Sequence, residues 1–113
     1  MGRDKNIGKD LVLDLLNNRK KYTAMINFVK QASHLVHDQD EFEFYMEKEK
    51  QLELLKDSIE YLTPVQRLVI QNIYFEEHSI REVARKFHMS KTSVDYQKQQ
   101  AIKFLRELFV EQP

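Results

Sequence analysis

Apolar residues recur at helical spacing along most of the chain, and the clearest pattern lies between residues 79 and 105. Ser79 followed three residues later by Glu82 matches a capping box, which starts a helix. An apolar stripe of i, i+1 and i+4 spacing follows it: Val83, Ala84 and Phe87. Such a stripe gives a short helix one buried side.

A second helix is predicted directly after this one. Ser90 is a typical N-cap residue, and Met89 before it and Val94 after it have the spacing of a hydrophobic staple. Only His88 and Met89 separate the two patterns. Two capped helices joined by so short a break predict a helix-turn-helix, whose second helix usually enters the DNA major groove.

A third helix is predicted upstream. Thr63 is an N-cap residue, Pro64 suits the first helical position, and Gln66 completes another capping box. The predicted buried side consists of Leu68, Val69, Ile73 and Phe75. We therefore expect a small helical domain over residues 62–113.

Residues 1–61 predict a helical extension of two to three helices. Asp10 is placed to cap a short helix that ends near Asn17 and Asn18, and a second pattern covers about residues 19–36. After a break at residues 37–40, the next apolar positions fall near a 3.5-residue period: Phe42, Tyr45, Leu52, Leu55, Ile59 and Leu62. This pattern favours an amphipathic helix packed on its own domain, although a homodimer seam or a partner-binding face over residues 41–62 is an alternative.

Composition narrows the class of protein. Two Gly and two Pro leave few turn residues for a β-fold, so the sequence predicts an all-α protein. The absence of Cys excludes a disulfide framework and a thiolate zinc site. No apolar run reaches the length of a membrane span, and the charged start lacks the core of a signal peptide, which predicts a cytoplasmic protein.

Charge is segregated along a chain whose formal net charge is zero. Residues 80–106 carry seven basic and two acidic side chains, whereas residues 37–61 carry nine acidic and three basic ones. A segregated basic patch is typical of a phosphate-binding surface. Both runs are also compatible with ordinary solvated helix faces. The basic cluster at residues 19–21 is compatible with contact to DNA or to an acidic partner, but a solvated helix start is the commoner explanation.

From residue 62 onward, the chain resembles region 4 of bacterial sigma factors. The residues that carry the resemblance are Leu62, Gln66-Arg67, Val69-Ile70, Tyr74-Phe75-Glu76-Glu77, Glu82-Val83-Ala84, Met89, Ser90, Val94, Ala101, Leu105 and Arg106. Two positions depart from the family. His88 stands where the turn commonly carries Gly, and Asp95 stands where a DNA-facing Arg or another polar residue is common. Nothing in residues 1–61 resembles sigma region 2. The chain is therefore similar to a stand-alone region 4 protein of the small phage or Gram-positive regulator type.

The outward face of the second helix provides the candidate DNA contacts. Residues near the start of a recognition helix reach base edges, and the base-readout candidates are Lys91, Thr92, Ser93, Asp95, Tyr96 and Gln99. The phosphate-contact candidates are Arg81, Arg85, Lys86, Ser90, Lys98 and Lys103. The resemblance also implies contact with the β-flap of RNA polymerase, near Val65, Leu68, Val69, Asn72 and Phe75, although part of this set is expected in the core.

These features predict a transcription regulator or sigma-like factor that reads promoter DNA through residues 90–104, together with RNA polymerase. Two alternatives remain: an inhibitor that occupies RNA polymerase or a sigma factor, and a helical phage assembly or packaging protein with an accessory DNA-binding motif. His34 and His37 have a spacing compatible with a metal site, but surface histidines explain it better, and we expect no metal or cofactor. No nucleophile–base pair, Gly-rich phosphate loop or carboxylate pair indicates an enzyme.

Overall fold

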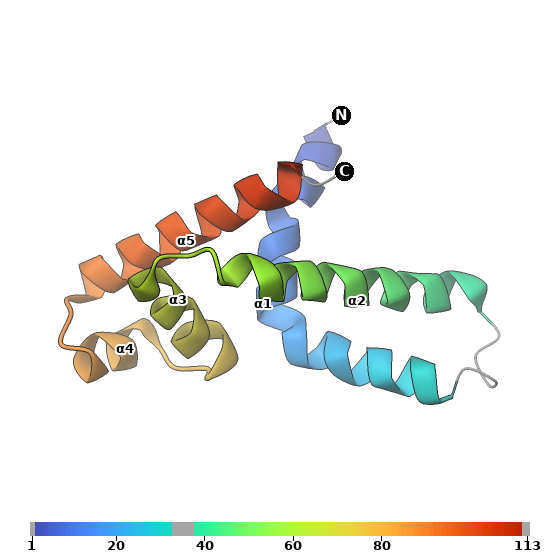
Figure 1. The fold of residues 1–113 in the computed structure, drawn as a ribbon, viewed down its shortest axis with the longest axis horizontal. Helices are drawn as coiled ribbons and strands as arrows, with labels where there is room; N and C mark the ends of the chain where they lie inside the picture. Colours follow the sequence, from blue (N-terminus) through green and yellow to red (C-terminus); the bar gives the residue numbers. More distant parts are fainter. Residues whose placement is uncertain (1, 33–37, 112–113) are drawn as a thin grey trace.

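The computed structural model describes residues 2–32 and 38–111, and every regular element in them is helical. In chain order the elements are α1 (Gly2–Gln31), α2 (Gln39–Ile59), α3 (Pro64–Ile70), the π-helix η2 (Gln71–Phe75), α4 (Ile80–Lys86) and α5 (Lys91–Glu111). The predicted all-α class is confirmed. In Figure 1, α4 and the start of α5 lie on one side, and α2 with the second half of α1 extends to the opposite side.

The larger hydrophobic core joins four helices from both ends of the chain. Its fully or nearly fully buried members are Val12, Leu15, Leu16, Leu55, Ile59, Leu62, Ile70, Ala101, Ile102 and Leu105. They come from α1, α2, α3, α5 and the turn before α3. Residues 11–16 of α1 therefore pack within the main core.

A second, smaller core lies within the helix-turn-helix. It consists of Val69, Val83, Ala84 and Val94, with Ile73, Ile80, Phe87 and Met89 packed against it. Val83 and Val94 have no exposed surface, as the apolar pattern predicted. This core holds α4 against α5 and against the end of α3.

The predicted start of α1 was wrong. The helix begins at Gly2, so Asp10 lies inside it and does not cap it. No proline interrupts residues 3–9, and the single Gly8 costs only about 1 kcal/mol relative to Ala, too little to end a helix. The helix end predicted near Val36 lies outside the described residues, and the described part of the helix ends at Gln31.

The predicted break at Asn17 and Asn18 appears as a kink within α1. Asn18 has non-helical backbone angles, with φ −118° and ψ 18°. Its side-chain Nδ2 donates to the backbone oxygen of Asp14 and to the Asp14 carboxylate, both at 3.0 Å. Asn side chains that bond nearby backbone groups compete with the helix in this way. The kink turns the second half of α1 alongside α2.

The helix α2 lies against its own chain, as predicted. Asp38 caps it, because its Oδ1 accepts from the backbone N–H groups of Asp40 at 3.0 Å and Glu41 at 3.2 Å. Leu55 and Ile59 near its C-terminal end are buried, whereas Phe44 is about half exposed. Among the residues described, no helix is long and apolar enough to cross a membrane.

Candidate nucleic-acid interface

Capping boxes fix the starts of the two helices before the recognition helix. The Ser79 N–H donates to the Glu82 carboxylate at 2.7 Å, and the Glu82 N–H donates to the Ser79 hydroxyl at 3.1 Å. Hydrogen bonds to the Glu82 carboxylate from the backbone N–H and from the side chain of Ser79 hold the pKa of Glu82 below its ordinary value. Thr63 and Gln66 form the same reciprocal pair at the start of α3. Both predicted boxes are confirmed.

The turn between α4 and α5 is a Schellman motif. The Met89 N–H donates to the Ala84 carbonyl at 2.8 Å, and the His88 N–H donates to the Arg85 carbonyl at 3.4 Å. The motif requires a left-handed backbone conformation at the residue after the helix cap. His88 adopts this conformation, with φ 56°. His88 therefore occupies the position at which glycine is favoured.

The recognition helix α5 begins directly after this turn. The Ser93 N–H donates to the Ser90 hydroxyl at 3.0 Å, so Ser90 caps the helix as predicted. Met89 packs against the small core that contains Val94, which is the contact expected of the staple. The two helices and their turn thus have helix-turn-helix geometry.

Residues 52–105 match the family model described as Sigma-70, region 4. These residues form a sigma region 4-like helix-turn-helix domain. Region 4 is a DNA-binding domain without enzymatic activity, and DNA and RNA polymerase are the kinds of partner that it binds. The domain therefore indicates a sigma-factor-like, transcription-related function. Searches of curated proteins and of solved structures found no match.

The region 4-like match begins inside α2. The C-terminal part of α2 therefore belongs to the matched stretch, and α1 lies outside it. The division predicted at residues 61 and 62 stays a prediction. The main core crosses it, because Val12 and Leu15 share that core with Leu105.

The outer face of the first turns of α5 is open to solvent. Five base-readout candidates are exposed: Lys91, Thr92, Asp95, Tyr96 and Gln99. Tyr96 keeps 58 % of its surface exposed. Ser93 is half-buried. The region 4-like domain thus presents this set on one face, and its role in base reading stays a prediction.

The phosphate-contact candidates are mostly exposed as well. The exposed members are Arg81, Arg85, Lys86, Ser90 and Lys103. Lys98 differs, because its side chain is 20 % exposed and its Nζ lies 3.7 Å from the Asp95 carboxylate. This i, i+3 pair was not predicted from the sequence. Lys98 offsets part of the negative charge that Asp95 brings to this face of α5.

The candidate polymerase contacts divide between core and surface. Val69 is fully buried and Asn72 is 8 % exposed, whereas Val65 is 42 % exposed. Phe75 is half-buried beneath the Arg19 guanidinium of α1, whose carbon lies 4.5 Å from the ring centre. Leu68 is also half-buried. Val65 thus offers the largest exposed fraction of these side chains to a partner.

Asn72 is a buried polar residue that the sequence analysis did not predict as structural. Its Nδ2 donates to the Leu68 carbonyl at 2.9 Å, and its Oδ1 lies 3.3 Å from Nδ1 of His78. The π-helix η2 widens the backbone here, and the chain then turns at Glu77 with φ 62°. This network fixes the segment that leads into α4.

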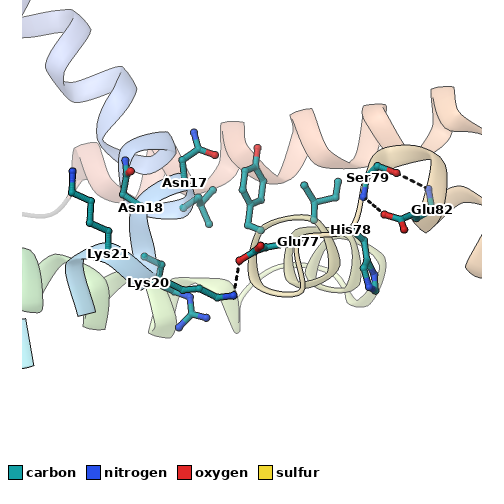
Figure 2. Close-up of a pocket in the computed structure, with 12 residues that line it drawn as sticks. Asn17, Asn18, Lys20, Lys21, Glu77, His78, Ser79 and Glu82 are labelled. Carbon is teal, nitrogen blue, oxygen red and sulfur yellow. Dashed lines mark hydrogen bonds and ion pairs between the residues drawn. The ribbon is translucent and has the colours of Figure 1, made fainter. Parts of the chain in front are cut away.

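An open pocket of about 610 Å³ separates the kink of α1 from the start of α4. Asn17, Asn18, Lys20 and Lys21 lie on one side of it, and Glu77, His78, Ser79 and Glu82 on the other (Figure 2). An ion pair between Lys20 and Glu77 joins the two sides. The sequence showed the basic cluster but not its neighbours, because no local pattern reports on a contact between residues so far apart.

The two histidines whose spacing is compatible with a metal site, His34 and His37, lie outside the described residues. Within residues 2–32 and 38–111, no group of three His, Cys, Asp or Glu side chains is arranged to hold a metal ion.

Proposed function

We propose that this protein is a sequence-specific DNA-binding transcription regulator that acts together with RNA polymerase. The observation that carries the proposal is the region 4-like helix-turn-helix with an exposed polar face on the first turns of α5. In this motif the first helix crosses the DNA backbone and the second lies in the major groove. Residues 90–104, which comprise the Ser90 cap and the N-terminal part of α5, would then read bases, and those of α4 would contact phosphates.

The charge distribution supports this orientation. The acidic helix α2 extends away from the side that holds α4 and the start of α5 (Figure 1). Its carboxylates are therefore remote from the face where a duplex would lie, and electrostatic repulsion between them and phosphates falls off within about 10 Å at 0.1 M salt. Net neutrality of the chain is thus compatible with a locally basic DNA-binding face.

The proposal is tested by selecting a binding site from random-sequence DNA with the full chain and then measuring affinity by gel shift over a range of salt. A selected consensus with steeply salt-dependent binding is expected. Lys91→Ala should weaken binding to the consensus by about 1–3 kcal/mol if Lys91 pairs with a base. Lys50→Ala, an exposed lysine on α2, is the matched control and should bind as the wild type does.

Two results would change the proposal. Equal loss on the consensus and on random DNA would make Lys91 a phosphate contact. Absence of DNA binding at low salt, with retained binding to RNA polymerase or a sigma factor, would favour an inhibitor that occupies the transcription machinery.

A further inference from the structure

The pocket at the kink of α1 brings a second basic segment next to the helix-turn-helix. Its walls come from α1 and from the start of α4, and it is wide enough to take a phosphate group with its water. Lys20, on the α1 wall, is turned towards Glu77, whereas Lys21 is turned away from it (Figure 2). Two neighbouring lysines therefore have different electrostatic surroundings.

The acidic side chains of the pocket are already engaged. Lys20 neutralises Glu77 through their ion pair, and the Glu82 carboxylate accepts the Ser79 N–H in the capping box. Lys21 is exposed, and no ion pair involves it in the part of the chain that the structure describes. Asn17, four residues earlier on the same wall of the pocket, is also exposed and carries two side-chain donors. Lys21 and Asn17 are thus free to bind an anion.

The pocket lies at the N-terminal end of α4, the helix that carries the phosphate-contact candidates Arg81, Arg85 and Lys86. Ser79, Glu82 and Lys86 have i, i+3 and i+7 spacing and so share one helix face. Ser79 and Glu82 line the pocket, and the exposed Lys86 lies at the other end of the same face. Seven residues of helix span about 10 Å, which corresponds to about three phosphates of one strand along the duplex axis. The pocket therefore lies within a few nucleotides' length of Lys86.

We propose that Lys21 and Asn17 form a second phosphate-binding site, which holds the same DNA strand that α4 crosses. This inference rests on the proposed DNA-binding function and deepens it. It assigns to the kink of α1 a role in affinity that is independent of base sequence, because backbone phosphates are alike at every step. The helix-turn-helix would contact the bases of the binding site, and the kink of α1 would contact phosphates of the DNA that flanks it.

The test is Lys21→Ala in the full chain, with gel-shift affinities on the selected duplex between 0.1 and 0.3 M salt. One lost phosphate contact reduces the slope of log affinity against log salt by about 0.9, which means roughly 8-fold weaker binding at 0.1 M salt. The loss should be the same on random DNA. Lys50→Ala removes the same charge from α2 and should leave both the slope and the affinity unchanged. Circular dichroism should show both variants folded, because both side chains are exposed.

Glu77→Gln gives an independent readout of opposite sign. It releases Lys20 and removes a negative charge from the pocket, so binding should tighten by up to about 8-fold with a steeper salt slope. If the pair between Lys20 and Glu77 served only to position α4, the same variant would weaken binding instead, and that result would overturn the inference.

The inference and the proposed function fail in different ways. If Lys21→Ala binds as the wild type does while Arg85→Ala weakens binding, the second phosphate site is wrong and the helix-turn-helix function stands. If the wild-type chain binds no DNA at low salt, both fall.

Discussion

The two hydrophobic cores differ in how far apart their residues lie in the sequence. The small core of the helix-turn-helix draws its buried members from residues 69–94, whereas the main core joins residues 12–105. The first is built from neighbouring helices whose caps and turns are encoded locally. The second depends on α1 packing between α2 and α5, which no local pattern specifies.

The two cores therefore hold different parts of the molecule in place. The small core sets the angle between α4 and α5, on which any reading of DNA depends. The main core anchors the long part of α5 and the end of α2 through a helix that lies outside the region 4-like match. The extension is therefore part of the structure that positions the recognition helix, and we expect the two parts to unfold together.

The largest expected effect comes from a cavity in the main core. Leu15 in α1 is fully buried, and Leu15→Ala should lower the free energy of unfolding by about 2–5 kcal/mol. Because Leu15 shares its core with Leu105, helical signal from both parts should be lost in one transition. Urea unfolding followed by circular dichroism and by tyrosine fluorescence measures this.

Thr23→Ala, at an exposed position of the same helix, is the control and should change stability by no more than about 0.5 kcal/mol. Two separate transitions in the Leu15→Ala protein, with the second at the wild-type midpoint, would show that residues 62–113 fold independently of α1.

The same contrast explains which features the sequence predicts. Ser79, Thr63 and Ser90 are caps whose partners lie three residues away, and each was predicted and confirmed. The start of α1 was predicted wrongly, because Asp10 is a possible cap but residues 3–9 contain no proline that would stop the helix from continuing upstream. The pair between Lys20 and Glu77 was missed as well, since it joins residues that only the tertiary fold brings together.

Asp14 is a second feature of the extension that sequence reasoning did not predict. Its carboxylate accepts from the Tyr22 hydroxyl at 2.8 Å, from Lys48 at 3.1 Å and from Asn18 at 3.0 Å, so it ties the two halves of α1 to each other and to α2. Burial opposes the charged carboxylate, but these bonds outweigh it and hold the pKa of Asp14 below its ordinary value of 3.8. Asp14→Asn should therefore destabilise the protein by about 1–2 kcal/mol at pH 7.

The pH dependence of this effect has a definite sign. A carboxyl group with a lowered folded pKa stabilises the fold above its unfolded pKa, and this stability is lost as pH falls through the folded value. The difference in stability between wild type and Asp14→Asn should therefore be constant near neutral pH and shrink below about pH 4. A difference for Asp14→Asn that persists unchanged at pH 3 would contradict a role for its charge.

The titration of the Tyr22 hydroxyl at alkaline pH reports on the same hydrogen bond. Burial and then the bond to Asp14 raise the pKa of Tyr22 to about 12. Its contribution to stability is therefore complete below about pH 10 and is lost as pH rises towards 12. Asp14→Asn should shift this tyrosine to a lower pKa, measured by the absorbance of tyrosinate during an alkaline titration.

The smallest expected effect lies in the turn of the helix-turn-helix. His88 holds φ 56°, where a side chain beyond glycine costs roughly 1–2 kcal/mol. Glycine removes this cost but adds about 0.4–1 kcal/mol of conformational entropy to the unfolded chain. His88→Gly should therefore raise the free energy of unfolding by about 0.5–1 kcal/mol, whereas His88→Ala, which keeps a Cβ, should give no gain.

DNA affinity should stay unchanged in both variants if His88 serves only the turn. A stabilised His88→Gly protein with weaker DNA binding would instead place the imidazole of His88 at the DNA interface, beside the start of the recognition helix.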